Sequence, residues 1–260
     1  MQTKRVTQLI PEVSVITVVK NDSKGLQKTI SSLFSQTFLT WECLIISARS
    51  EDDTQVVATE IADSDNRVTH IQESAPGIYE AMNQGILLAK APALVFMNAG
   101  DVFASSNAIE NLYKELVDRN CPIVIGGYST GEKIFSYKRK TFGPKSFSLN
   151  RRWGCHQSMI LRTNVVNSVG GFSLEYKIAS DFDLVLKILS KFNGTRIREV
   201  VSVIEPNGIS SKHIRQVLAE KQEIRRKHFG KCSWSAFLGE VWTVLVISKI
   251  KLRLLIGILR

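Results

Sequence analysis

The first hundred residues alternate between apolar runs and helical patterns, and this alternation constrains the fold more than any other feature. A β-branched apolar run at 13–19 and an apolar run at 93–97 predict two buried strands, and the segments 41–46 and 68–71 predict two more strands. Between the runs, apolar residues recur at helical spacing, and Ser23 is expected to cap the first helix. Strands that alternate with helices favour a parallel, doubly wound α/β sheet.

Polar segments follow three of the predicted strands, at 20–23, 47–53 and 98–101. In open α/β sheets, ligands bind at the carboxyl ends of the strands. We therefore expect the functional site at that edge of the sheet.

The second half of the chain is less regular. Short strands are predicted at 123–125, 155–161 and 200–204, and Ser180 is expected to begin a helix. Residues 133–152 hold seven basic residues and no acidic one, and we interpret them as a long loop over one face of the domain.

Charge is unevenly distributed along the chain. The 260 residues carry 34 Lys and Arg against 24 Asp and Glu, a net charge of +10. Residues 206–260 hold 11 basic and 3 acidic residues, so 11 − 3 = +8 of this charge lies there. A basic tail on a nearly neutral body indicates an anionic partner.

Composition and missing motifs exclude several classes of protein. A 44% hydrophobic and 22% charged chain is globular, and its four scattered cysteines form no CxxC pair, which disfavours a zinc cluster or a disulfide framework. Neither GxGxxG nor GxxxxGK[ST] occurs, which counts against a dehydrogenase or a P-loop enzyme. No signal peptide and no membrane-spanning run are expected from the pattern.

Asp101 directly follows a buried strand, where a carboxylate is well placed to hold a divalent cation. Mg²⁺ or Mn²⁺ needs few protein carboxylates when phosphate oxygens and water complete its shell. The alternative is a helix N-cap, a position that Asp also favours.

Asp181 and Asp183 open the helix that begins at Ser180. A base that removes a proton from a sugar hydroxyl must be ionised and within hydrogen-bond reach. Residues two apart on a helix point in different directions, so at most one of these carboxylates should face a reaction. The alternative is that both simply favour the first turn of a helix.

His156 and the basic segment permit two interpretations each. A single His is usually structural, and the four His of the chain form no metal-ligand spacing. The basic segment, which includes Arg151 and Arg152, is either a solvated loop or a set of point charges for phosphate groups.

Four segments, taken in order, resemble those of a known family. Residues 77–86 read GIYEAMNQGI, 96–101 read FMNAGD, 156–158 read HQS and 176–184 read YKIASDFDL. Together they resemble the inverting family 2 glycosyltransferases of the GT-A fold, over about 12–211. Among these, the chain is similar to bacterial enzymes that assemble exopolysaccharide, O-antigen or colanic-acid-type units.

The resemblance implies a fold and a role for individual residues. It implies an α/β fold of the GT-A type, in which helices flank a Rossmann-like mixed central sheet. The residue pattern beyond 211 adds the prediction of a basic amphipathic helical tail. Asp101 resembles the metal-binding Asp that holds the donor diphosphate through Mn²⁺ or Mg²⁺, and Asp181 resembles the general base. The implied donor-binding residues are Thr17, Val19, Asp52, Tyr79, Asn83 and Asn98. The candidate acceptor or phosphate contacts are His156, Asp183, Arg151 and Arg152.

The chain departs from the family pattern at three acidic positions. Ser47, Ala75 and Gly100 stand where many members have Asp or another acid. The first of these acids usually contacts the nucleotide base, so the resemblance leaves both a UDP-sugar and a GDP-sugar as donors.

The C-terminal stretch 239–260 is apolar, with Lys and Arg residues interspersed. One interpretation is a helix that lies on a membrane surface, with Lys249, Lys251 and Arg253 near lipid phosphates. The alternative is an amphipathic helix that packs on the domain or on a second subunit. Nucleic-acid binding is not expected, because the basic residues gather with an apolar tail.

We therefore predict an N-terminal extension (1–11), a GT-A domain (12–211) and a basic helical region (212–260). The predicted function is inverting, metal-dependent transfer of one sugar from a nucleotide-sugar to a polyprenyl-diphosphate-linked saccharide. The predicted place is the cytoplasmic face of the bacterial plasma membrane. A transferase that makes polyprenyl-phosphate sugars and a catalytically degenerate GT-A subunit are the alternatives.

Overall fold

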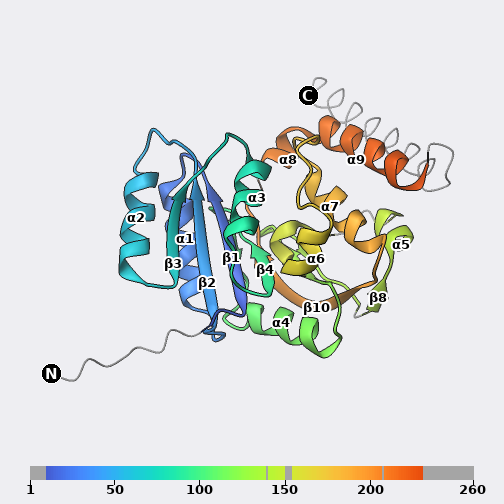
Figure 1. Cartoon of the computed structure of the whole chain (residues 1–260), viewed down its shortest axis with the longest axis horizontal. Helices are drawn as coiled ribbons and strands as arrows, with labels where there is room; N and C mark the ends of the chain where they lie inside the picture. The colour runs from blue at the N-terminus through green and yellow to red at the C-terminus, as the bar shows by residue number, and fades with distance from the viewer. Residues whose placement is uncertain (1–9, 139, 150–153, 207, 231–260) are drawn as a thin grey trace, which may run out of the picture.

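A mixed sheet with helices on both faces forms the body of the molecule (Figure 1). The computed structural model describes residues 10–138, 140–149, 154–206 and 208–230. Within these residues the sheet has ten strands. The strands are β1 (Val13–Val19), β2 (Trp41–Ser47), β3 (Val68–Gln72), β4 (Ala93–Phe96), β5 (Val102–Phe103), β6 (Ile123–Ser129), β7 (Ile134–Phe135), β8 (Lys140–Phe142), β9 (Met159–Arg162) and β10 (Gly194–Val203).

The helices precede and follow these strands along the chain. They are α1 (Ser23–Phe34), α2 (Thr54–Ser64), α3 (Ile78–Leu88), α4 (Ala108–Asp118), α5 (Pro144–Leu149), α6 (Thr163–Ser168), α7 (Ser180–Leu189), α8 (Ile209–Lys212) and α9 (Ile214–Phe229), with a 3-10 turn η1 (His156–Ser158).

The half of the sheet built by the first hundred residues is wholly parallel, and β6 and β10 of the second half also pair in parallel. Strands β3, β2, β1 and β4 pair in parallel, as the alternation predicts. The sheet becomes mixed at β9, which runs antiparallel to both β4 and β6. The mixed sheet implied by the family resemblance is confirmed. A strand that enters from a loop rather than through a crossover helix is free to pair antiparallel.

Two apolar layers separate the sheet from its helices. On one face, α1, α2 and α4 pack on the sheet through residues such as Leu26, Ala58 and Leu112. On the other face, α3, α6 and α7 cover it, and Met82 and Phe182 belong to that layer. Both faces of β1 and β4 are therefore covered, which explains why these strands are apolar at nearly every position.

Two segments of the second half differ from their predictions. Residues 133–152 were expected to form one loop, but they contain β7, β8 and α5. Residues 155–161 were expected to form one strand, but η1 occupies the first part and β9 begins only at Met159. Strand β8 gains a partner, β10, that lies far away in sequence, which is why local patterning misses it.

The first helix is capped by Asp22 rather than by the predicted Ser23. Oδ1 of Asp22 accepts a hydrogen bond of 2.9 Å from the backbone N–H of Gly25, and Ser23 is the first helical residue. Asp is as good a cap as Ser, so the sequence rule identifies the helix start to within one residue.

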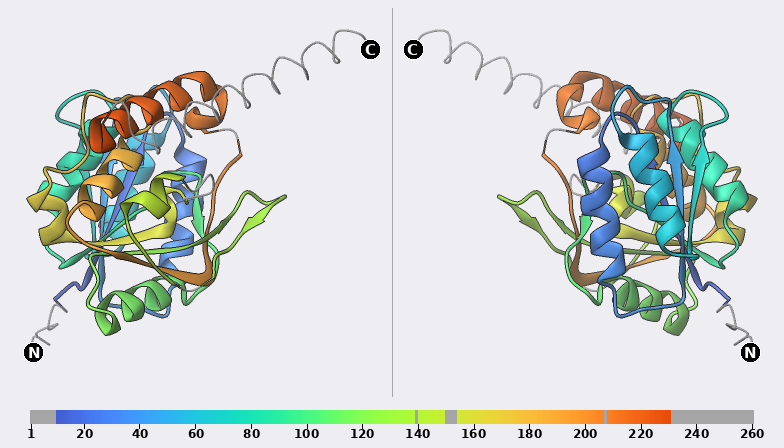
Figure 2. Two further views of the ribbon diagram at one scale, coloured as in Figure 1. Left: turned by 90° about the vertical axis from the view of Figure 1, so that its right-hand side faces the viewer. Right: turned by 90° about the vertical axis from the view of Figure 1, so that its left-hand side faces the viewer.

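Helix α9 lies across the end of the molecule beside α7, away from β2 and β3 (Figure 2). The predicted boundary at 211/212 falls inside α8. Ile224 of α9 is 0% exposed and belongs to the same apolar cluster as α7. The predicted tail helix at 239–260 and most of the extension 1–11 lie outside the described residues.

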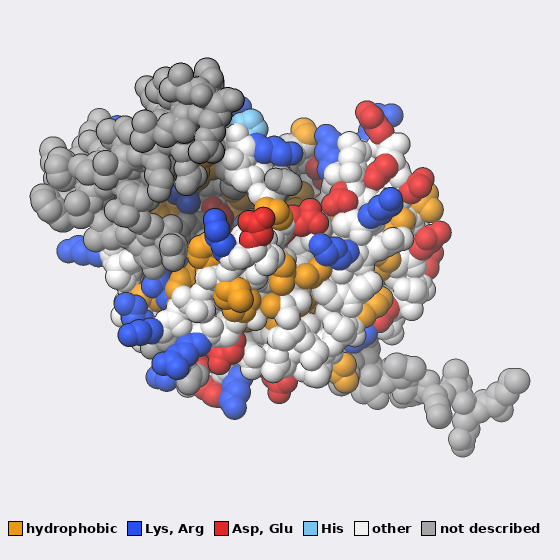
Figure 3. Space-filling model, turned by 180° about the vertical axis from the view of Figure 1, so that it is seen from behind, with side chains coloured by type: hydrophobic (Ala, Val, Ile, Leu, Met, Phe, Trp, Pro, Cys, Tyr) orange, Lys and Arg blue, Asp and Glu red, His pale blue; other side chains and the backbone are white. Residues whose placement is uncertain are grey.

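Basic side chains gather on one side of the surface. In the view from behind, they concentrate on the side where β8 and α5 lie, whereas both signs of charge mix on the other side (Figure 3). Lys133, Lys138, Lys140 and Lys145 of the basic segment are exposed. Among the described residues, no helix has the length and apolar character that a membrane crossing requires.

Candidate active site

Asp101 lies just beyond β4, at the carboxyl end of the parallel strands. The backbone N–H groups of Met97 and Ala99 donate to carbonyls of β1, so the segment after β4 continues along its neighbour. Gly100 then turns the chain with φ = +92°, a conformation that L-residues rarely adopt. The turn explains why glycine precedes Asp101, where the family pattern has a second acid.

The carboxylate of Asp101 is almost enclosed, with 6% of the residue exposed. Oδ2 accepts a 2.7 Å hydrogen bond from Nε2 of Gln157, and Oδ1 accepts one of 2.9 Å from the backbone N–H of Glu205. Burial raises the pKa of Asp101 above 3.8, although these two hydrogen bonds act in the opposite direction. Asp101 is not a helix N-cap, so that alternative is excluded.

Asp181 lies in the first turn of α7, as predicted. Its Oδ1 accepts a 2.7 Å hydrogen bond from the backbone N–H of Phe182, and its Oδ2 lies 3.4 Å from Nδ1 of His156. The carboxylate thus lies at the N-terminal end of a helix, with one oxygen bound to a backbone N–H and the other near His156.

Two adjacent residues of η1, His156 and Gln157, connect the two acids. His156 contacts Asp181, and Gln157 contacts Asp101. The other ring nitrogen of His156, Nε2, lies 3.0 Å from Nδ2 of Asn98. If the amide is oriented with Nδ2 toward the ring, Nε2 accepts and Nδ1 carries the proton toward Asp181. The structure thus brings together Asn98, Asp101, His156 and Asp181 from three separate segments.

Asp183 occupies a different environment from Asp181. Its side chain is 2% exposed; it forms an ion pair of 2.8 Å with Lys187, and its Oδ1 lies 2.8 Å from Nε2 of His228 in α9. Burial by itself would raise the pKa of Asp183, but the hydrogen bonds from His228 and Lys187 outweigh burial and hold it below 3.8. Only one of the two acids of α7 thus belongs to the group around His156, and a role of Asp183 in acceptor binding stays a prediction.

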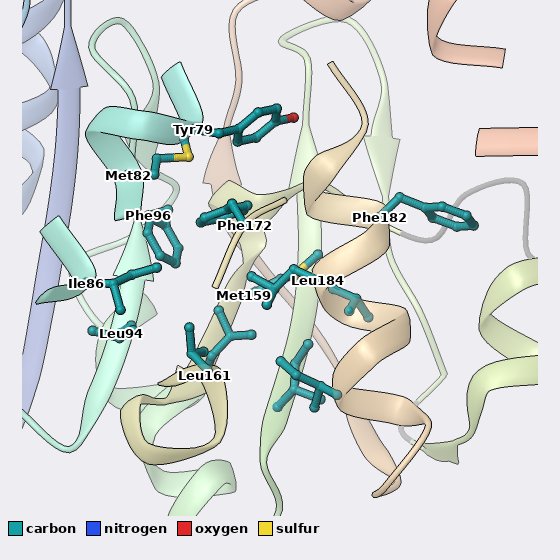
Figure 4. Packing of buried hydrophobic residues seen from close by; sticks show 14 of the residues in the cluster. Tyr79, Met82, Ile86, Leu94, Phe96, Met159, Leu161, Phe172, Phe182 and Leu184 are labelled. Atoms are coloured by element: carbon teal, nitrogen blue, oxygen red, sulfur yellow. The ribbon is translucent and has the colours of Figure 1, made fainter. Parts of the chain in front are cut away.

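Tyr79 and Asn83, expected in the donor pocket, both bind backbone groups of the second half. The hydroxyl of Tyr79 donates a 2.7 Å hydrogen bond to the carbonyl of Ile178, and its ring stacks on Phe172 (Figure 4). The amide of Asn83 donates to the carbonyl of Phe172 and accepts from its N–H, each at 2.9 Å. Desolvation raises the pKa of the Tyr79 phenol, which therefore stays a hydrogen-bond donor.

The remaining donor-binding candidates surround the ends of β1 and β2. Thr17 and Val19 are buried in β1, with 0% and 5% exposure. Asp52 joins two loops, since its carboxylate accepts from the hydroxyl and N–H of Thr54 and from the N–H of Ser23. These hydrogen bonds, that of the Thr54 hydroxyl first, hold the pKa of Asp52 below its ordinary value. Direct contact of the three residues with a nucleotide stays a prediction.

Ser47, which replaces an acid of the family pattern, is enclosed in a polar network. Its hydroxyl donates to Oε1 of Gln55 at 3.1 Å and lies 2.7 Å from Nε2 of His70. The other ring nitrogen of His70 lies 3.1 Å from the hydroxyl of Thr59. Neutral hydroxyl, amide and imidazole groups therefore surround the position where the pattern has a carboxylate.

The residues around Asp101 fit a divalent cation that is shared with a diphosphate. Oδ1 of Asn98 and Oε1 of Gln157 are buried oxygens without a hydrogen-bond partner among the described residues. Such oxygens, beside one carboxylate, suit a hard cation that takes its other ligands from phosphate and water. In the described part of the chain, no three His, Cys, Asp or Glu side chains lie close enough together to hold a metal ion.

Sequence reasoning missed Gln157 and Thr29 as members of this site. The hydroxyl of Thr29 in α1 donates a 2.6 Å hydrogen bond to the backbone carbonyl of Asp101. The position of Gln157 directly after His156 was the only signal for its role. Arg151 and Arg152 lie outside the described residues.

Comparison with known proteins identifies the family. Residues 14–174 match the family described as Glycosyl transferase family 2, which is more than half of the chain. The chain belongs to glycosyl transferase family 2. An uncharacterized glycosyltransferase of Mycobacterium tuberculosis is 28% identical over 208 residues, which is 77% of this chain and 78% of that protein. The chain is therefore a glycosyltransferase.

Solved structures share the fold at low sequence identity. S. aureus TarS matches with a TM-score of 0.65 at 15% identity, over 86% of this chain but only 44% of the TarS chain. The mannosyltransferase PcManGT from Pyrobaculum calidifontis, solved in complex with GDP-Man and Mn²⁺, matches with a TM-score of 0.65 at 15% identity, over 92% of this chain and 76% of that chain. The GT-A fold implied by the four sequence segments is confirmed.

Proposed function

We propose that this glycosyltransferase moves one sugar from a nucleotide-sugar donor to a lipid-linked saccharide, with inversion at the anomeric carbon and with help from a divalent cation. The observation that supports this most directly is the contact of adjacent residues, His156 and Gln157, with Asp181 and Asp101. The acid proposed to bind the metal and the acid proposed to act as the base are therefore linked through one short turn, η1.

In the proposed reaction, Asp181 accepts the proton of the acceptor hydroxyl as its oxygen attacks the anomeric carbon. The bond to the nucleoside diphosphate breaks on the opposite side, so a single displacement inverts the configuration. His156 orients the carboxylate, and the N–H of Phe182 stabilises its charge. In this proposal, Asp181 accepts the proton and Asp101 takes part in binding the diphosphate, so each acid has one role.

Asp101 is the proposed protein carboxylate of the cation site, with the amide oxygens of Asn98 and Gln157 as further candidates. A bound Mn²⁺ or Mg²⁺ would compensate the charge of the departing diphosphate. In support, the PcManGT structure holds GDP-Man with Mn²⁺. A UDP-sugar is an equal candidate, since a TarS 1-349 structure holds UDP-GlcNAc.

The nucleotide is tested by thermal unfolding with UDP or GDP, each with and without Mn²⁺. A ligand present at 100 times its Kd stabilises the folded state by about 2.7 kcal/mol, which gives a measurable shift in Tm. We expect a metal-dependent shift with one of the two nucleotides. The absence of any shift would favour the degenerate-domain alternative.

The acceptor is proposed to be a polyprenyl-diphosphate-linked saccharide at the cytoplasmic face of the membrane. The sequence of residues 239–260, apolar with Lys and Arg interspersed, supports binding at an anionic membrane surface. Deletion of these residues should move the protein from the membrane fraction to the soluble one, and unchanged fractionation would contradict the proposal. Product analysis then distinguishes sugar on sugar from sugar on phosphate.

A further inference from the structure

Helix α9 approaches the segment that leads into the catalytic helix α7. Both oxygens of Glu220 accept hydrogen bonds from three successive backbone N–H groups of that segment. The N–H of Lys177 binds Oε1 at 3.2 Å, and the N–H groups of Ile178 and Ala179 both bind Oε2 at 2.9 Å. Asp181 follows Ala179 by two residues.

This contact lies directly ahead of a helix that has no side-chain cap of its own. The N-cap residue of α7 is Ala179, which has no side chain to accept from the first N–H groups of the helix. A carboxylate before a helix N-terminus also interacts favourably with the helix dipole. The N–H groups that Glu220 binds belong to residues 177–179, ahead of the first turn of α7. Glu220 therefore provides negative charge near the helix N-terminus and fixes the backbone that leads into it.

The same peptide is held from its other side. The carbonyl of Ile178 accepts from the hydroxyl of Tyr79, while its N–H binds Glu220. Glu220 is itself fixed, because Nε2 of Gln216, one turn earlier in α9, donates a 2.9 Å hydrogen bond to its Oε1. Two rigid helices, α3 and α9, thus determine where the backbone enters α7.

The attachment of α9 to the domain does not depend on Glu220. His228 pairs with Asp183, Lys227 pairs with Glu175 at 2.6 Å, and Ile224 is fully buried. Loss of the Glu220 carboxylate should therefore release residues 177–179 without detaching α9. A local displacement of α7 would move Asp181 relative to His156. Their contact is already 3.4 Å long, so a small further separation would break it.

We propose that Glu220 is a positioning residue for the general base Asp181. This inference rests on the proposed function, because it assigns to Glu220 an effect on catalysis through Asp181. It also assigns a part of the active site to a helix that lies beyond the residues matched by the family, 14–174.

The test compares the full chain with Glu220→Gln and with the control Glu223→Gln. Glu223 lies on the same helix and is exposed, so its variant has the same change of charge without the contact. Gln keeps the length of Glu, but its NH₂ group opposes the N–H donors. The first measurement is hydrogen exchange of the peptide that contains residues 177–182. We expect Glu220→Gln to accelerate exchange by about tenfold, since hydrogen bonds to a charged group are lost, with no change in the control.

The second measurement is turnover with UDP-GlcNAc and GDP-Man as donor probes, Mn²⁺ and a bacterial lipid extract as acceptor. A displaced base should lower kcat by about tenfold to a hundredfold and leave the KM for the donor within about twofold. A general loss of folding would instead change both parameters and the Tm. Gln216→Met, which weakens the support of Glu220 and keeps its charge, should show a smaller loss of kcat in the same direction.

The decisive comparison combines Glu220→Gln with Asp181→Asn. If Glu220 acts through Asp181, the double variant should be no slower than Asp181→Asn alone. Additive losses, or unchanged exchange in Glu220→Gln, would overturn the role of Glu220 and leave the proposed function intact. A normal rate in Asp181→Asn would instead contradict the proposed base, and the two failures are thus distinguishable.

Discussion

Nε2 of Gln157 lies 2.7 Å from Oδ2 of Asp101, so a turn in the second half of the chain fixes the acid that follows β4. The next residue toward the N-terminus, His156, contacts Asp181. Movement of this turn would therefore disturb both acids together. The predictions below separate the contributions of the individual residues.

Asp181→Asn should abolish the base and preserve the shape of the side chain. We expect transfer to slow by about 10²-fold to 10⁴-fold, the usual contribution of a general base. Binding of the nucleotide should remain, which isothermal titration with UDP or GDP and Mn²⁺ will check. A variant that retains normal turnover would mean that another group accepts the proton.

Asp101→Asn should remove the charge that holds the cation. The amide still provides an oxygen for the N–H of Glu205, so the fold should survive. We expect the nucleotide-dependent rise in Tm to lose its dependence on Mn²⁺. Equal nucleotide affinity with and without Mn²⁺ in the wild-type protein would show that Asp101 serves a structural purpose only.

Asn83→Ala tests whether Asn83 acts on the fold or on the donor. Two hydrogen bonds to the backbone of Phe172 would be lost, which should lower the free energy of unfolding by about 2 kcal/mol. Urea denaturation measures this loss, with Gln84→Ala as a control that removes only solvent-exposed bonds. A raised Kd for the nucleotide at unchanged stability would instead support the expected place in the donor pocket.

Asp183→Asn should destabilise the protein in a pH-dependent way. Removal of one partner of a buried ion pair costs about 3 kcal/mol near neutral pH. Because the folded-state pKa of Asp183 lies below the unfolded value near 3.8, its stabilisation is complete above that value. The stabilisation is lost as the pH falls through the folded-state pKa. Urea denaturation of both proteins between about pH 3 and about pH 7 measures their free energies of unfolding. The difference between the two free energies should shrink toward the acid end, and a constant difference would contradict this account.

Local patterning predicted the parallel half of the fold well. Strands β1 to β4 begin where the predicted strands begin, and β1 and β4, which are covered on both faces, are apolar at nearly every position. The short strands β7 and β8 escaped prediction, since three residues such as 140–142 carry too little periodicity to indicate a strand. Their pairing with β6 and β10 was decided by tertiary contacts.

The chain's sequence determined which acids are candidates, through four segments that resemble a family and through the position of Asp101 and Asp181 after a strand and at a helix start. Only the tertiary structure decided that Asp183 pairs with His228 of another helix, and that Glu220 binds the backbone ahead of Asp181. The reason is physical. Hydrophobic periodicity reports the burial of each residue, which is a local property. The partner of a polar side chain depends on how distant segments pack, and no local pattern records that.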